Sequence, residues 1–247
     1  MRTPDIAPLI GGIVMLAVWE LAVRLTGVAT YLLPAPTAIA NALISGAPVL
    51  IPSAVVTLGL ALQALLFALL LGVGLAVLFS RVTWLGRALG PYALVLQATP
   101  VVAIAPLVII WTGVENPRTA ILILATIVAF FPVLANATAG LAAIDPGLDR
   151  LFRLHRAKPL DRFLRLEVPT AAPYLLAGIE TAAGLALVGA VVAEFVAGTG
   201  ATGGLAWRIV EAGNRLETPT MFAALILLAI MGVVLATSIG WARKKFA

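Results

Sequence analysis

Long uncharged apolar runs alternate along this chain with short polar segments. Four of the runs contain no Asp, Glu, Lys or Arg and exceed the roughly 20 residues that a helix needs to cross a bilayer; they are residues 54–79, 88–114, 119–144 and 219–242. Residues 7–23 and 168–197 are also apolar, but the first contains Glu20 and the second contains Glu180 and Glu194. We predict a membrane-spanning helix in each run, so the expected fold is all-α and polytopic with six transmembrane helices.

The composition agrees with a membrane protein. With 62% hydrophobic and 11% charged residues, the 247-residue chain has too little polar surface to cover a soluble globule. The lack of cysteine excludes disulfides, thiolate metal sites and cysteine nucleophiles, and a single histidine, His155, does not make a metal cluster. A cleaved signal peptide is disfavoured because Glu20 stands where a small-residue cleavage site should begin, so we expect an uncleaved first helix.

The positive charges predict the orientation. With six spans and a cytoplasmic N-terminus, twelve of the 16 Lys and Arg residues lie in cytoplasmic segments, and the other four, Arg24, Arg118, Arg208 and Arg215, lie outside. The positive-inside rule therefore predicts that both termini are cytoplasmic. The net charge of +5 follows from this topology and from anionic lipid headgroups, and we expect no nucleic-acid partner.

Six positive charges are concentrated in residues 150–165, inside a predicted cytoplasmic loop. The pattern predicts a short helix whose apolar face follows an i, i+3, i+4, i+7 spacing, at Leu148, Leu151, Phe152 and His155. Pro159 should break this helix, and Leu160 begins the apolar face of a second one. From the pattern, two interpretations remain open. The Leu/Phe corner docks in a groove on another protein, or both helices lie flat on the inner leaflet.

Three ordered segments resemble the membrane subunits of binding-protein-dependent ABC importers, in the group for nitrate, sulfonates, taurine and vitamin precursors. They read QATPVVAIAPLVIIWTG from Gln97, AFFPVLANATAGLAAIDPGL from Ala129 and VPTAAPYLLAGIETAAGLALVGAVVAEF from Val168. The resemblance runs from about residue 54 to the C-terminus. It implies a type I importer permease fold, with a first helix and outer interfacial segment in residues 1–53 and the transport domain in residues 54–247.

In that family a Glu-Ala-Ala and a later Gly mark the loop whose helices couple to the ATPase subunit. The resemblance places this coupling loop at residues 145–167. Alignment from Val168-Pro169 puts the Glu-Ala-Ala on Arg150, Leu151 and Phe152 and the Gly on Arg156, so the motif is degraded while the helix–turn–helix pattern remains. The implied coupling residues are Asp149, Leu151, Phe152, Arg153, His155, Arg156 and Leu160.

ATP chemistry is expected on a separate subunit, because the sequence contains no G-x-x-x-x-G-K-[ST] phosphate-binding loop. We therefore expect a transport subunit that is not an enzyme and needs no cofactor. The stretch GTGATG at residues 198–203 fits G-x-G-x-x-G, but it follows an apolar helix instead of a strand. We interpret it as a flexible outer loop.

Polar residues inside the predicted spans are the tentative translocation path. Glu180 lies 11 residues beyond Pro169, which is about 16 Å along a helix and near mid-membrane by this count. Glu194 is expected near the outer surface. Four uncharged polar residues are candidates that could instead bond a neighbouring helix: Gln97, Thr99, Asn136 and Thr138.

The outer segment, residues 32–53, is polar enough to leave the membrane. Thr37 is expected to cap a short helix that follows Pro36 and either rests at the outer interface or helps to receive the binding protein. The spans carry an acid and no base, which favours a neutral or zwitterionic solute, such as taurine or a pyrimidine vitamin precursor, over a bare inorganic anion.

The resemblance implies a multi-pass protein of the bacterial inner membrane, surrounded by lipid. Its expected partners are ATP-binding subunits, an extracytoplasmic solute-binding protein and a second permease subunit, taken as a second copy of this chain. An ion-coupled secondary transporter is the alternative, but internal repeats and paired coupling-ion carboxylates are not found in the sequence. An intramembrane enzyme would need a nucleophile or metal set at membrane depth.

Overall fold

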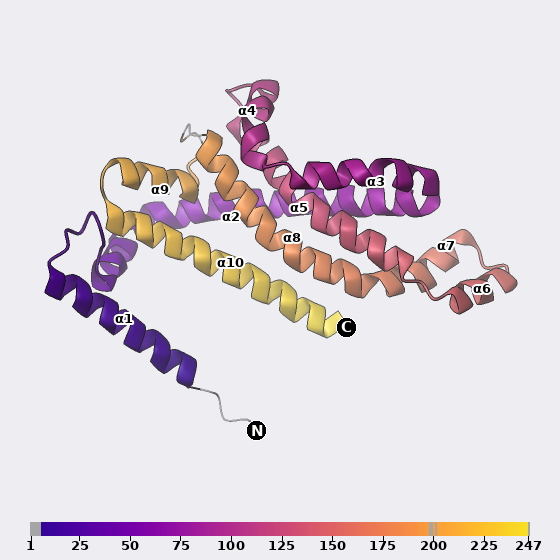
Figure 1. The fold of residues 1–247 in the computed structure, drawn as a ribbon, viewed down its shortest axis with the longest axis horizontal. Coiled ribbons are helices and arrows are strands. Elements are labelled where there is room, and N and C mark those ends of the chain that lie inside the picture. Colours follow the sequence, from indigo (N-terminus) through magenta and orange to yellow (C-terminus); the bar gives the residue numbers. More distant parts are fainter. Residues whose placement is uncertain (1–5, 198–199, 201, 247) are drawn as a thin grey trace. The chain divides into compact units, whose positions relative to one another are not determined.

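The structure is a computed structural model that describes residues 6–197, 200 and 202–246. These residues form helices and connecting loops, with no strand among them, which confirms the all-α prediction. The elements are α1 Ala7–Thr26, α2 Pro36–Arg81, α3 Thr83–Ala98, α4 Val101–Thr112, α5 Pro117–Ala142, α6 Pro146–Leu154, α7 Pro159–Arg162, the π-helical turn η1 Phe163–Glu167, α8 Val168–Ala197, α9 Leu205–Asn214 and α10 Thr218–Phe246 (Figure 1).

A helix occupies each of the six predicted positions, but the helices differ in how well they suit a membrane crossing. Among the described residues, four stretches are long and apolar enough to span: Pro36–Arg81, Pro117–Ala142, Pro159–Ala197 and Thr218–Trp241. The pair α3 and α4 would make a fifth if it counts as one bent span. The helix at the first predicted position, α1, has 20 residues, of which Glu20 and Arg24 are charged.

The predicted span over residues 88–114 is bent, because it consists of α3 and α4, which meet at an angle of 100°. Thr99 and Pro100 separate the two helices, and both have extended backbones, with ψ of 124° and 120°. A proline disfavours the α conformation in the residue before it and has no N–H to donate. The same sequence that predicted an apolar run therefore also contained its break.

The predicted short helix after Pro36 is wrong. Instead α2 continues for 46 residues with Pro48 and Pro52 inside it. Thr37 is not its N-cap residue. The Thr37 backbone N–H and hydroxyl donate to the Glu20 carboxylate of α1 at 3.0 and 2.9 Å, so an acid from another helix caps the start of α2.

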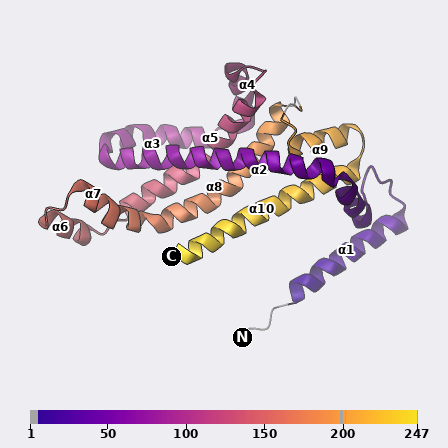
Figure 2. The ribbon, with the colours of Figure 1, turned by 180° about the vertical axis from the view of Figure 1, so that it is seen from behind.

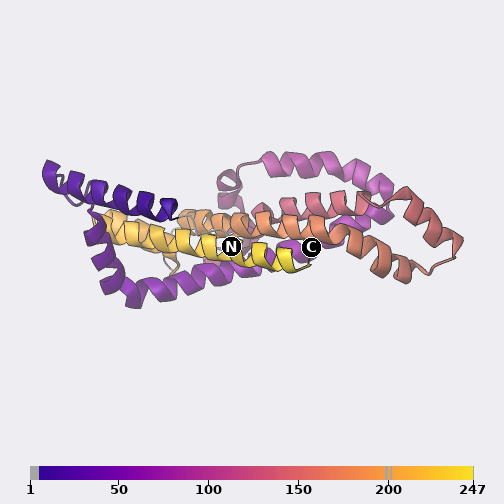
Figure 3. The same cartoon turned by 90° about the horizontal axis from the view of Figure 1, so that it is seen from below.

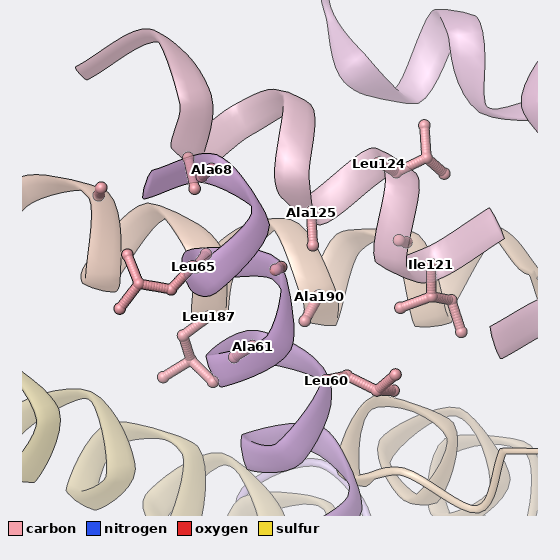
Figure 4. Packing of buried hydrophobic residues seen from close by; sticks show 14 of the residues in the cluster. Leu60, Ala61, Leu65, Ala68, Ile121, Leu124, Ala125, Leu187 and Ala190 are labelled. Carbon is pink, nitrogen blue, oxygen red and sulfur yellow. The ribbon is translucent and has the colours of Figure 1, made fainter. Parts of the chain in front are cut away.

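The chain divides into two compact units, of which residues 57–202 and 230–247 form the larger. Its centre is the pair α5 and α8, which lie side by side, with α4 packed against both (Figure 1). The buried cluster combines alanines and leucines of α2, α5 and α8, and Figure 4 shows members from all three helices, among them Leu65, Ile121 and Leu187. Small side chains predominate in this cluster, as is typical of closely packed membrane helices.

Glycines set the closest approach between α5 and α8. A Cβ atom on Gly178 would lie 2.8 Å from Asn136 Cβ, and one on Gly189 would lie 3.0 Å from Ala125 Cα. A Cβ atom essentially never comes as close as 2.8 Å to another atom, and 3.0 Å is tighter than most Cβ contacts, so a side chain at either position would require α5 or α8 to shift. The two helices therefore depend on these positions for their packing.

The smaller unit contains residues 1–56 and 203–229. Trp19 of α1 packs on Phe222 of α10 with ring centroids 6.1 Å apart, and the Thr218 hydroxyl donates to the Tyr31 carbonyl at 2.7 Å. The amphipathic helix α9 buries Leu205 and Ile209. Helix α9 follows the predicted flexible loop, and residues 198, 199 and 201 of that loop lie outside the described residues. Arg2, one of the twelve cations that the orientation prediction places in the cytoplasm, also lies outside them.

Candidate functional site

The predicted coupling loop forms a corner of two short helices, as expected. The helices α6 and α7 lie beyond the ends of α5 and α8 at one end of the larger unit (Figures 1 and 2), and Figure 3 shows the same projection from below. Asp145 caps α6, because its carboxylate accepts from the Leu148 N–H at 2.9 Å. Pro159 begins α7 after an extended Lys158, so the proline makes the break where the sequence placed it.

Arg156 turns the chain between the two helices with a φ of +47°. This left-handed conformation costs a residue with a Cβ roughly 1 to 2 kcal/mol, whereas glycine adopts it freely. Arg156 is the position on which the importer motif places its glycine. The backbone at this position is therefore one that glycine adopts freely, although the residue is an arginine.

Leucines dominate the exposed surface of this corner. We call the set Leu148, Leu151, Leu154, Leu160 and Leu164 the apolar knuckle; their exposed fractions run from 47% for Leu151 to 79% for Leu154. Phe152 is half-buried, and His155 is exposed with its Nδ1 2.9 Å from the Leu151 carbonyl. An exposed group of large apolar side chains on a loop is a typical binding surface.

An ion network lies behind the knuckle and joins it to α2. We define it as Arg81, Asp149, Arg153, Arg162 and Glu167. The Arg81 guanidinium donates to both Glu167 oxygens at 2.9 and 2.7 Å, and Arg162 bridges Glu167 to Asp149, with 2.8 Å from its Nε to Asp149 Oδ1. Arg153 adds a 2.8 Å pair to Asp149.

Two predicted coupling residues, Asp149 and Arg153, are therefore paired inside the loop. The Arg162 guanidinium that hydrogen-bonds to Asp149 holds the pKa of that carboxyl below its ordinary value, with Arg153 adding to the effect against a smaller contribution of burial. The carboxylate stays charged at neutral pH. The resemblance implied that Asp149 and Arg153 contact another subunit. The sequence does not reveal the pairing of Asp149 with Arg162, because the two residues are 13 positions apart.

Three other cations of the loop are exposed. Within the described residues, Arg150, Arg156 and Lys158 have no carboxylate at ion-pair distance. They surround the knuckle with positive charge. A surface of exposed leucines edged by free cations is complementary to an apolar groove with an acidic rim.

A second feature of the larger unit is a cavity of about 880 Å³ between α2, α3 and α5. Two residues of the predicted path, Gln97 and Thr138, line it, together with Arg87 and the rings of Phe79 and Phe131. A cavity of this size accommodates a small organic solute. Thr99 lines a neighbouring cavity of about 210 Å³ that shares Gln97 and Phe131.

Two predicted path residues bond within their own helices. The Thr99 hydroxyl donates to the Val95 carbonyl at 3.0 Å, and the Asn136 amide donates to the Pro132 carbonyl at 2.8 Å. Pro132 lies inside α5. Both are side-chain bonds to the carbonyl four residues back, which satisfy the polar group within its own helix.

The two acids of α8 lie at different levels. Glu194 is 3% exposed and accepts from the Thr57 hydroxyl of α2 at 2.9 Å, so it ties α2 to α8. Glu180 pairs with Arg243 of α10 at 2.7 Å, two residues past the end of the apolar span at Trp241. The pairing gives Glu180 a counter-charge on α10. Its place near mid-membrane stays a prediction.

Comparisons with known proteins fit this arrangement. A family model described as "Binding-protein-dependent transport system inner membrane component" matches residues 68–247. The chain belongs to this family. Across its whole length this permease is 31% identical to a probable ABC transporter permease of Haemophilus influenzae, of which the match covers 98%.

Two further relatives each align with 90% of the length of this permease. One is a riboflavin transport system permease of Chloroflexus aurantiacus, 34% identical and covered to 81%. The other is a formylaminopyrimidine transport permease of Halalkalibacterium halodurans, 30% identical and covered to 87%.

A solved structure shares the fold. The permease aligns with a chain of the MetNI methionine ABC transporter in an inward-facing conformation with a TM-score of 0.68 at 16% identity, over 81% of this chain and 96% of that one. The predicted type I importer permease fold is thereby confirmed. The permease is a membrane transport subunit of an ABC importer.

Proposed function

We propose that this permease forms half of the solute passage of an ATP-driven importer and pairs with a second copy of itself. The loop at residues 145–167 docks in a groove of an ATP-binding subunit, and an extracytoplasmic binding protein delivers the solute. The observation that carries the proposal is the apolar knuckle, because five exposed leucines edged by free cations are unfavourable in water and suit a groove on a protein. Asp149 and Arg153 support the knuckle from within.

The orientation follows the positive charges, with both termini and the knuckle in the cytoplasm. The docking interpretation is favoured over helices lying flat on the inner leaflet, because the ion network holds α6 and α7 at a fixed corner. A loop that only adsorbed to lipid would gain nothing from this internal fastening. Leu151, Phe152 and Leu160 are the proposed contacts, with His155 and Arg156 at their edge.

For the solute we propose a flat heterocycle of the vitamin-precursor class, neutral or zwitterionic. The cavity beside α3 offers aromatic and aliphatic walls, with the Gln97 amide, the Thr138 hydroxyl and the Arg87 guanidinium as polar groups. Two relatives that share 90% of the chain are named for riboflavin and formylaminopyrimidine. An aliphatic sulfonate is the second candidate, supported by a Bacillus subtilis relative that is 32% identical over 66% of the chain. Thr99, Asn136, Glu180 and Glu194 are assigned to the support of this passage.

Co-purification tests the proposal directly. The tagged permease, co-expressed with its ATP-binding subunit, should retain that subunit, and ATP should drive uptake in liposomes when the binding protein is present. Leu151→Asp should abolish retention, because a charge in the knuckle removes its fit to the groove, while Leu151→Met should keep it.

Two results would overturn the proposal. One is solute uptake by the permease without any ATP-binding subunit, which is the behaviour of an ion-coupled secondary transporter. The other is normal ATP-driven transport by Leu151→Asp. The solute class is decided separately by the ligand that the binding protein retains.

A further inference from the structure

Glu167 is a buried carboxylate that the passage and the docking surface do not use. Its exposed fraction is 2%, and two guanidiniums from different elements, Arg81 of α2 and Arg162 of α7, bond to it. A buried charge is tolerated only when partners compensate its lost hydration. The site is therefore built around this carboxylate, and either arginine keeps it compensated if the other is removed.

The π-helical turn η1 makes this arrangement possible. Arg162 and Glu167 are five residues apart, and in an α-helix such residues point about 140° away from each other around the axis. In η1 the Val168 N–H instead bonds to the Phe163 carbonyl, five residues back. The wider turn brings positions five apart onto the same face, so the Arg162 guanidinium meets Glu167.

The network is the main side-chain fastening of the loop, because α6 and α7 contain no buried residue. Asp149 on α6 reaches Glu167 through Arg162, and Glu167 reaches α2 through Arg81. Arg81 is the last residue of α2, and its guanidinium also lies 5.8 Å from the centre of the Phe163 ring. Ala76, Phe79 and Ser80 of the preceding turns line the large cavity.

We propose that Glu167 is a positioning residue that makes the knuckle and the end of α2 move as one body. A displacement of α6 by the ATP-binding subunit then shifts the α2 wall of the cavity directly, in addition to the covalent route through α8. This inference rests on the proposed function for its mechanical consequence. Its structural part, the fastening of α6 to α2, holds independently of any partner.

The test removes the link to α2 and leaves Glu167 compensated by Arg162. Arg81→Met keeps an unbranched stem beside Phe163 but loses both hydrogen bonds to the carboxylate. Arg165→Met is the matched control, because Arg165 lies on the same turn as Glu167, η1. Its side chain is 76% exposed and contacts only the exposed Asp161, at 3.8 Å. Arg81→Lys keeps the charge without the paired geometry and should give an intermediate result.

The first measurement needs no partner. The chain has no cysteine, so Leu78→Cys on α2 and Lys158→Cys on the loop can carry two spin labels on the full-length permease in lipid nanodiscs. The distance distribution between the labels should be narrow with Arg81 and with Arg165→Met, and broad with Arg81→Met. Equal widths in all three would overturn the fastening.

The second measurement uses the complete importer. ATP hydrolysed per solute molecule transported should rise about two- to thirty-fold in Arg81→Met, the range for residues that carry coupling between sites, and stay unchanged in Arg165→Met. An unchanged ratio in Arg81→Met overturns the inference while leaving the proposed function intact. A parent complex that neither binds an ATPase nor transports overturns the proposed function, and the label distances still decide the fastening. If Arg81→Met does not insert, Arg81→Lys decides both measurements by the same criteria.

Discussion

At Arg156 the chain has a backbone conformation that favours glycine, although the residue is an arginine. The importer motif has glycine where this chain has Arg156, and the backbone there is left-handed, with a φ of +47°. An arginine in this conformation is strained, and such strain persists where contacts of the residue with the protein or with a partner compensate for it. Arg156 was predicted as a coupling residue, and its backbone and its side chain are two separate reasons for that role.

Two substitutions separate these reasons. Arg156→Ala removes the side chain and keeps the strained backbone, whereas Arg156→Gly removes both. We expect Gly to stabilise the turn relative to Ala by about 1 kcal/mol, seen as about fivefold slower hydrogen exchange of the loop amides. Retention of the ATP-binding subunit should fall equally in both if the side chain forms a contact. Equal exchange rates in Ala and Gly would contradict the strain.

At the scale of elements, proline and glycine decide where helices break and how closely they pack. Pro100 divides an apolar run into α3 and α4, and Pro159 separates α7 from α6, yet Pro132 and Pro173 lie inside continuous helices. The sequence marks every one of these positions as a possible break. Packing and the conformation of the preceding residue determine which of these prolines interrupt a helix.

A matched pair of glycines in α8 tests the packing. Gly178→Val places its side chain against Asn136, where a Cβ would lie 2.8 Å away, while Gly184 has nothing within 4 Å of its Cβ position. We expect Gly178→Val to lower the free energy of unfolding by about 1 to 3 kcal/mol through overpacking, and Gly184→Val to leave it nearly unchanged. Thermal unfolding of the purified permease in detergent measures both. A similar loss in the two variants would contradict the close approach of α5 and α8.

For the whole molecule, the family match and the solved structure agree on a subunit that works in an assembly. The match covers residues 68–247, and the fold similarity covers 81% of the chain. In the proposed function the chain supplies a wall of a passage and an exposed knuckle, and other subunits supply ATP chemistry and solute capture. The division at residue 54 into two sequence segments stays a prediction.

The orientation gives the prediction that belongs to this scale. Because the chain has no cysteine, single cysteines report which side of the membrane a loop faces. Lys158→Cys should react with a membrane-impermeant maleimide only after the cells are permeabilised, whereas Glu115→Cys between α4 and α5 should react in intact cells. Labelling of Lys158→Cys in intact cells would place the knuckle outside and exclude docking to an ATPase.

The sequence by itself determined the helical class, the positions of the apolar helices and the two-helix corner of the loop. Hydropathy and proline act locally along the chain, so these features need no knowledge of distant residues. The degraded motif also pointed to residues 145–167, because spacing survives the loss of individual side chains. Gln97 and Thr138 were singled out in the same way, since a polar residue in an apolar run is visible in the sequence.

Only the tertiary structure shows which side chains pair with one another. Arg81 and Glu167 are 86 residues apart, and Thr57 and Glu194 are 137 apart, so no periodicity connects them. Glu20 caps α2 and Glu180 pairs with Arg243 in the same way: the packed helices determine which group lies within reach of each carboxylate. The cavity likewise exists only once α2, α3 and α5 are placed together.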